Sequence, residues 1–314
     1  MPPPPPTIAL LFLTIRDHPH QAAWRDFFDR KNPHAKLFKA YTHAKQPSAV
    51  RSDSFLRTYG DVLPDGARKR RTTRRGRRVS TRKHATVSTR WGHLVHAYYV
   101  LLCAALHDPA RPQHVRFVYV SDACVPFGTA TDVYTRLMAH PNHTLLDRPR
   151  PHDNLDRYDP QAQRLARAGI QRAHFIKHSG WFALCRKDAA RLAREKQAFL
   201  ALNRVKAGDE HILSILMRPK YGKGASLRDQ VVTFVRWDYA LAAKWTPDAA
   251  GFWDAIDHEP DPQKKNVLRR LYKLWRAANM HPVTFTKITP ADRAAFVASG
   301  CCFVRKVGAG VKVV

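Results

Sequence analysis

The chain has 314 residues, of which 44% are hydrophobic and seven are Trp, so it is long enough to bury a sizeable core. Its formal net charge of +29 indicates attraction to polyanions: nucleic acid, anionic membrane surfaces or nucleotide phosphates. Five cysteines without CxxC spacing argue against a disulfide framework and a structural zinc site, and they favour a reducing compartment.

The first 44 residues have the pattern of a β-α-β unit. Residues 7–15 (TIALLFLTI) are an apolar run that is too short to span a bilayer and is typical of a buried strand. Residues 20–30 predict an amphipathic helix and residues 36–44 a second strand, so we expect a parallel sheet with a right-handed crossover. The sequence shows no secretory leader and no membrane-spanning segment, and we therefore expect a cytoplasmic protein.

Residues 46–85 lose hydrophobic periodicity and become basic and polar, so we expect a flexible insertion within a single domain that covers residues 1–314. Within it, residues 67–83 form a basic tract with ten Lys or Arg residues and no acid. The tract is either a solvated surface segment or an electrostatic contact to a polyanion such as nucleic acid. It has no interleaved aromatic residues, which argues against stacking on single strands.

The rest of the chain alternates between strand and helix patterns. The predicted helices are 89–108, 129–140, 187–202 and 263–279, and the predicted strands are 115–126, 173–186, 231–239 and 301–307. A polar connection over 141–170 separates the first three of these elements from the rest. This order predicts an open, mostly parallel α/β sheet flanked by helices. Ligands bind such sheets beyond the carboxyl ends of the strands, which makes Asp122, where VRFVYVSD ends, a candidate binding residue. A cap of the following turn is the alternative role for Asp122.

The stretch AGDEHILSIL (207–216) places two acids at the start of an apolar helix pattern. Asp209 is predicted to be the N-cap, and Glu210 then lies in the first helical turn. Glu210 either complements the helix dipole or acts as a general base. Sequence motifs of other enzyme classes are absent: the chain has no GxSxG, Walker, GxGxxG, HExxH or Asp-x-Asp motif, so we expect no metal site.

Five groups of segments, in chain order, resemble the core-2/I-branching β-1,6-N-acetylglucosaminyltransferases, particularly their divergent plant-type branch, and more distantly the protein xylosyltransferases. The groups are IALLFLTIRD with WRDFF and AYTHA; TRWGHLVHAYYVLLCAAL; VYVSDACVPFGTATDVYTRLM; RYDP with HSGWFALCR and GDEHILSIL; and VVTFVRWDY with HPVTFTKI and CCFVRKV. They span almost the whole chain outside the basic tract. Two positions depart from the family pattern: His178 replaces a Gly, and Lys287 stands where the family usually has Arg.

The resemblance implies a GT-A-like fold and an inverting transfer of a sugar, GlcNAc or xylose, from a UDP-sugar to a hydroxyl of a glycan. It implies that Glu210 is the catalytic base and that no metal or other cofactor is needed. Fixed cations must then meet the charge of the leaving diphosphate, and the family's basic residues fall on Lys306 and Lys287. A Lys supplies a point charge without the bidentate fork of Arg.

The same resemblance assigns further binding residues. On the donor side they are Asp122 and Ser179, and on the acceptor side Trp237, Tyr239, Arg157 and Tyr158. Aromatic rings can stack on the C–H faces of a sugar, although Trp237 and Tyr239 could instead pack against the sheet. Arg157 and Tyr158 could equally be a surface loop pair.

Two hypotheses from different classes remain open. In the first, the chain is an enzyme that binds a UDP-sugar donor and a glycan acceptor. In the second, it is a polyanion-binding or nucleic-acid-binding protein on a degenerate glycosyltransferase scaffold, with the basic tract as its functional part. The joint presence of Glu210, Lys306 and Trp237 favours the enzyme.

Overall fold

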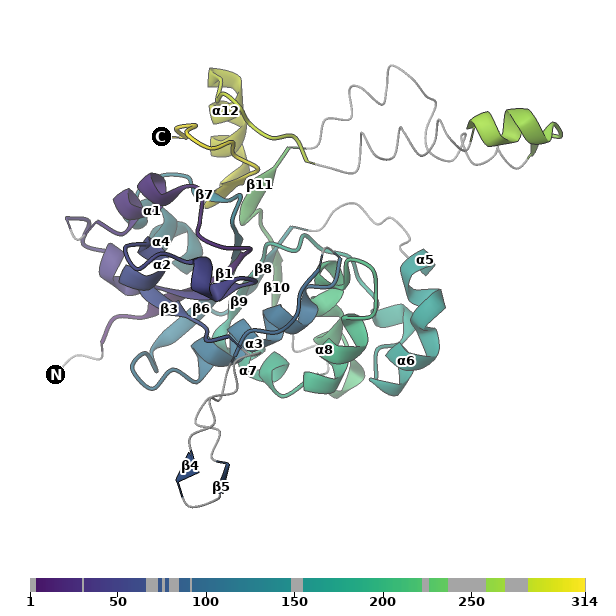
Figure 1. Ribbon diagram of the computed structural model, residues 1–314, viewed down its shortest axis with the longest axis horizontal. Helices are drawn as coiled ribbons and strands as arrows, with labels where there is room; N and C mark the ends of the chain where they lie inside the picture. The colour runs from purple at the N-terminus through teal and green to yellow at the C-terminus, as the bar shows by residue number, and fades with distance from the viewer. Residues whose placement is uncertain are drawn as a thin grey trace.

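The computed structural model describes residues 4–29, 31–65, 73–74, 77–78, 85–90, 92–147, 155–221, 226–236, 258–268 and 282–313 (Figure 1). Its main sheet has seven strands in the order β10-β8-β9-β6-β1-β2-β3. In chain order these are β1 (Thr7–Thr14), β2 (Phe38–Ala44), β3 (Gly60–Val62), β6 (His114–Ser121), β8 (Thr144–Leu146), β9 (Ala183–Cys185) and β10 (Leu227–Asp229).

Most neighbouring strands of this sheet run parallel. β1 pairs in parallel with both β2 and β6, β2 with β3, and β8 with β10. Only β9 is reversed, since it pairs antiparallel with β6 and β8. Because β6 and β8 both run opposite to β9, they share one direction, and the carboxyl ends of β1, β2, β6 and β8 meet at the same edge of the sheet.

Helices cover both faces of the sheet because β1 alternates its side chains between two apolar cores. All eight residues of β1 are buried; Ala9 and Leu11 pack in one core, whereas Leu10 and Phe12 pack in the other. The first core lies under α3 (Val95–Leu106), α6 (Ala162–Arg167), α7 (Arg186–Ala193) and α8 (Lys196–Leu202), and the second under α1 (Gln21–Phe27), α2 (Phe55–Thr58) and α4 (Ala130–Met138) (Figure 1). Each fully buried large apolar side chain contributes about 1.5–3 kcal/mol.

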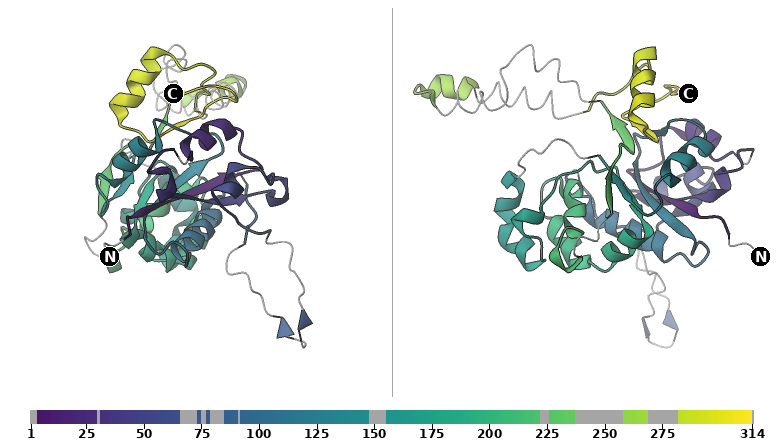
Figure 2. Two further views of the ribbon diagram at one scale, coloured as in Figure 1. Left: turned by 90° about the vertical axis from the view of Figure 1, so that its left-hand side faces the viewer. Right: turned by 180° about the vertical axis from the view of Figure 1, so that it is seen from behind.

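A second, three-stranded sheet lies beside the first. It has the order β11-β12-β7, formed by Thr233–Val235, Phe303–Arg305 and Val125–Pro126. Helix α12 (Pro290–Ser299) packs on it through Phe296, whose ring contacts the rings of Phe127, Phe234 and Phe285 (Figure 2). Strand β12 therefore brings the C-terminal residues of the chain back to the main sheet.

The predicted open, mostly parallel α/β sheet flanked by helices in a single domain is confirmed, with differences in individual elements. The predicted connection 141–170 contains β8, α5 (Leu155–Tyr158), the 3₁₀ turn η3 (Asp159–Gln161) and α6. Of the predicted strand 173–186, only β9 pairs as a strand, and its first residues belong to the 3₁₀ turn η4 (Arg172–His174). The predicted helix 187–202 is two helices, α7 and α8, and α12 was not predicted. Of the predicted helix 263–279, the structure describes residues 263–268, which are helical.

The predicted flexible insertion at 46–85 begins too early. Residues 47–62 form the 3₁₀ turn η2 (Pro47–Ala49), helix α2 and edge strand β3, and Phe55 and Leu56 are fully buried. Within the basic tract the structure describes only the paired strands β4 (Thr73–Arg74) and β5 (Arg77–Arg78), so the remainder of the tract lies outside the described residues. None of the helices described is long and apolar enough to cross a bilayer.

Gly60 determines how closely β3 can approach β2. A Cβ atom at this position would lie 2.0 Å from the carbonyl oxygen of Ala40, its partner in the strand pair. We therefore predict that Gly60→Ala lowers the free energy of unfolding by about 1–3 kcal/mol, measured by urea denaturation. Hydrogen exchange should accelerate at the Leu63 amide, which donates to the Thr42 carbonyl at 2.9 Å. An unchanged unfolding free energy would show that β3 is not a required part of the sheet.

Candidate active-site cleft

A cleft of about 600 Å³ opens at the carboxyl edge of the main sheet. The ends of β1, β2, β6 and β8 contribute Thr14, His43, Asp122 and Asp147 to its lining. Substrates of open α/β sheets bind at this edge, where the strands end and the loops diverge. The lining also includes residues 177–181, residues 206, 207, 209 and 210, and Arg157.

Glu210 lies on a 3₁₀ helix, not on an α-helix. The helix, η5, covers Gly208–Ile215, and the residue before it, Ala207, has a left-handed backbone with φ of 51°. Gly208 is pressed against α8, since a Cβ there would lie 2.1 Å from the Leu202 carbonyl oxygen. The predicted N-cap at Asp209 is therefore wrong: Asp209 lies inside η5, and Ala207 precedes the helix without a side-chain cap.

Residues 176–178 are hydrogen-bonded along η5 and fix its position. The His178 amide donates to the Glu210 carbonyl at 2.9 Å, and its ring Nε2 accepts from the Leu213 amide at 3.1 Å. Burial lowers the pKa of His178 to about 4, so its ring is neutral and its Nδ1–H donates to the Ser179 carbonyl. Ser214 Oγ also accepts from the Ile176 amide at 3.0 Å. The His178 ring therefore supports the backbone of η5 at Leu213, and the main-chain amide of the same residue holds the Glu210 carbonyl.

The Glu210 carboxylate is paired with two cations in the cleft. Arg157 Nη1 lies 2.7 Å from Glu210 Oε2, and Lys177 Nζ lies 4.0 Å from the same oxygen. The Glu210 side chain is 30% exposed, so a small molecule in the cleft can reach it. A carboxylate that is accessible and held in place has the properties that a general base needs.

Asp209 presents a second carboxyl group beside Glu210. It packs against Gly180, where a Cβ would lie 3.1 Å from Asp209 Oδ2. Burial, together with the negative charge of Glu210, raises the pKa of Asp209 to about 6. The two neighbouring acids therefore have different environments. Glu210 is in an ion pair with Arg157, whereas burial disfavours the charged form of Asp209.

Arg305 and Lys306, at the end of β12, also line the cleft. The Arg305 guanidinium lies over the Trp181 ring, 4.8 Å from its centroid, and its Nε donates to Ser121 Oγ at 3.2 Å. Burial raises the pKa of Asp122, and the charge of Arg305 opposes that rise. Ser121 Oγ, not Asp122, accepts from the amide of the following turn, at Ala123. No three His, Cys, Asp or Glu side chains in the described ranges are grouped as metal ligands would be.

The structure brings together five of the nine predicted site residues: Glu210, Lys306, Asp122, Ser179 and Arg157 all line the cleft. Tyr158 does not, because its side chain is buried against Phe175 and its hydroxyl donates to the Ile170 carbonyl at 3.2 Å. The predicted pair of Arg157 and Tyr158 is therefore divided between the cleft and the core.

Lys287 is exposed and does not line the cleft. Two residues earlier, Phe285 is buried under α12, and two residues later Thr289 caps that helix, so the chain has already turned away from the cleft. Trp237 and Tyr239 lie outside the described residues. Val235, at the end of β11, lines the cleft.

The lining residues missed as site candidates in the sequence include Arg305, Lys177, Asp147 and Lys206. For two of them the sequence held a signal that could have identified them. Arg305 immediately precedes Lys306, and Asp147 follows strand β8 in the same way as Asp122 follows β6. For Lys177, which matters through its contact with Glu210 33 residues away, the local sequence gives no signal.

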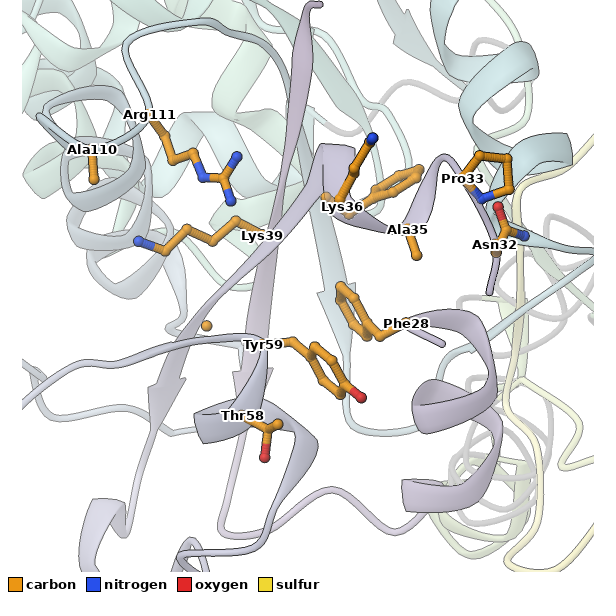
Figure 3. A pocket seen from close by; sticks show the side chains of 12 residues that line it. Phe28, Asn32, Pro33, Ala35, Lys36, Lys39, Thr58, Tyr59, Ala110 and Arg111 are labelled. Carbon is orange, nitrogen blue, oxygen red and sulfur yellow. The ribbon is translucent and has the colours of Figure 1, made fainter. Parts of the chain in front are cut away.

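A second cavity, of about 650 Å³, lies at the opposite edge of the sheet, where β2 and β3 begin (Figure 3). The rings of Phe28 and Tyr59 stack in it at 4.9 Å, with Lys39 and Arg111 to one side. No Asp or Glu residue lines this cavity, and Lys39 is already paired with Asp61 and Asp108. A carboxylate base is therefore available in the cleft and not here.

Comparison with known proteins gives a family for this arrangement. The model of the family described as Core-2/I-Branching enzyme matches residues 8–260, a range that includes Asp122, Ser179 and Glu210 and ends before Lys306. The protein named Glycosyltransferase BC10 from Oryza sativa subsp. japonica is 27% identical over 199 residues. The matched region is 63% of this chain and 43% of that protein, so the chain spans less than half the length of this relative.

The raised pKa of Asp209 predicts a stability that falls as pH rises. Between the ordinary value near 3.8 and about 6, the folded state binds more protons than the unfolded state, so its stability decreases across this window. Asp209→Asn has no charge to bury and should be more stable than wild type above pH 6, by roughly 2–3 kcal/mol. Chemical denaturation at pH 4, 5, 6 and 7 measures the free energy of unfolding of both proteins. If the difference between them is the same at all four pH values, Asp209 is solvated in the folded state.

Proposed function

The chain belongs to the Core-2/I-branching enzyme family, and on this basis we propose that it is a glycosyltransferase that moves a sugar from a UDP-sugar to a hydroxyl of a glycan acceptor. GlcNAc or xylose is the proposed sugar, by resemblance. The observation that carries the proposal is the cleft itself, in which a held carboxylate, Glu210, lines the same cavity as two cations, Arg305 and Lys306. The first residue is suited to accept a proton and the other two to bind a diphosphate.

In the proposed reaction Glu210 is the general base of an inverting transfer. Its carboxylate takes the proton of the acceptor hydroxyl while that oxygen bonds to the anomeric carbon of the donor. The bond between the anomeric carbon and the diphosphate oxygen breaks at the same time, and UDP leaves with the electron pair. Arg157 and the His178 amide hold Glu210 from its side chain and its backbone, so the base is positioned before the substrates arrive.

The leaving diphosphate requires positive charge, which we assign to Arg305 and Lys306 in place of a metal ion. Arg305 supplies the planar fork that suits phosphate oxygens, and Lys306 supplies a point charge beside it. The contacts of Arg305 with Trp181 and Ser121 fix its guanidinium, so little reorganisation is needed when charge develops. The family resemblance assigns this role to Lys306 and Lys287. We assign it to Lys306 and Arg305, because Lys287 is exposed outside the cleft.

Glu210→Gln tests the base. The amide keeps the shape of the side chain and cannot take a proton, so we predict a folded protein that binds UDP and transfers about 10²–10⁴-fold more slowly. The measurement is the rate of UDP release from a UDP-sugar with a sugar acceptor, or of slow donor hydrolysis without one. Wild-type rates in a folded Glu210→Gln variant would remove Glu210 from the mechanism.

Lys306→Met tests the metal-independent donor site. We predict that UDP raises the melting temperature of the wild-type protein in the presence of EDTA and that this shift is lost or strongly reduced in Lys306→Met. The matched control is Lys287→Met, which removes the same charge from an exposed position outside the cleft and should retain the shift. A UDP shift that disappears with EDTA and returns with manganese would contradict metal-free binding.

A further inference from the structure

The cleft carries more positive than negative charge, and two of its cations contact Glu210. Its lining includes seven Lys or Arg residues and four Asp or Glu residues. Arg305 and Lys306 lie together at the end of β12, where the proposed donor diphosphate binds. Arg157 and Lys177 contact Glu210, and Arg90 and Lys206 line the cleft close to the hydrogen bond between the Ala207 amide and the Gly92 carbonyl.

The ion pair with Arg157 occupies one oxygen of the Glu210 carboxylate, Oε2. Oε2 of Glu210 already accepts from Arg157 at 2.7 Å and lies 4.0 Å from Lys177 Nζ. An acceptor hydroxyl must approach this carboxylate to lose its proton, so the part of the acceptor next to that hydroxyl comes within reach of both cations. A neutral acceptor leaves Arg157 with Glu210 as its only carboxylate partner among the described residues.

An anionic acceptor changes this balance. A carboxylate or sulfate beside the reacting hydroxyl would give Arg157 and Lys177 a second partner, and charge-assisted hydrogen bonds of this kind are the strong ones. Arg157 has several N–H donors, so it can move toward the new anion and leave lone pairs of Glu210 available to the hydroxyl proton. The donor does not supply this anion, because its diphosphate is proposed to bind Arg305 and Lys306.

We propose that the acceptor of this enzyme is an acidic glycan, whose anionic group binds Arg157 and Lys177 and draws Arg157 away from Glu210. This inference rests on the proposed function, because it assumes that Glu210 is the base and that the acceptor reaches it. Acceptor selection and activation of the base would then depend on the same two cations.

The experiment compares a matched pair of probes, trigalacturonic acid and its fully methyl-esterified form, which differ in charge and little in shape. Binding to the full chain, saturated with UDP, is measured by ligand-observed NMR in wild type and in Lys177→Met. We expect wild type to bind the acid about tenfold more tightly than the ester, and Lys177→Met to lose most of that preference. The matched control is Lys36→Met, an exposed Lys at the second cavity, which should keep the preference.

The control separates this site from general attraction to a highly basic protein. If the acid binds no better than the ester, or if Lys36→Met and Lys177→Met reduce the preference equally, the inference is wrong, while UDP binding and UDP release still support the proposed function. If UDP neither binds nor is released from a UDP-sugar, the proposed function itself fails. If Lys177→Met loses the preference for the acid and Lys36→Met keeps it, the result supports both the inference about the acceptor and the proposed function.

Discussion

The ion pair between Arg157 and Glu210 is the contact on which the proposed chemistry depends. It joins Arg157 of α5 to Glu210 of η5, two residues that are 53 positions apart in the chain, at a distance of 2.7 Å. The pair holds the carboxylate at one place in the cleft through its Oε2 atom. An acceptor anion that draws Arg157 away, as proposed, would act on the oxygen that Arg157 occupies, so acceptor binding and the proposed catalysis meet at the same atoms.

The rest of the fold places this pair in one cleft with Arg305 and Lys306. Parallel strands bring their carboxyl ends to one edge, which places Asp122 and Asp147 at the floor of the cleft. The second sheet returns the chain through β12, which ends at Arg305 beside Trp181. The proposed base and the proposed phosphate-binding cations therefore come from different parts of the chain, and only the folded sheet brings them together.

The sequence predicted the parts of the fold that depend on local pattern. Strands β1 and β6 were recognisable because both of their faces are buried, which leaves apolar runs at residues 8–13 and 117–120. The start of η5 was wrongly predicted because its geometry depends on the contact between Gly208 and Leu202, which a local capping rule cannot show. Similarly, the resemblance identified Glu210 and Arg157 separately, but their pairing and the approach of Lys177 are tertiary contacts.

A single carboxylate base and one displacement at the anomeric carbon require inversion of configuration. The most direct measurement is proton NMR of the sugar released during the first minutes of turnover of an α-linked UDP-sugar, before the anomers equilibrate in solution. The mechanism predicts that the β anomer appears first, at a rate that falls in Glu210→Gln. An α anomer as the first product would contradict a one-step transfer with Glu210 as its base.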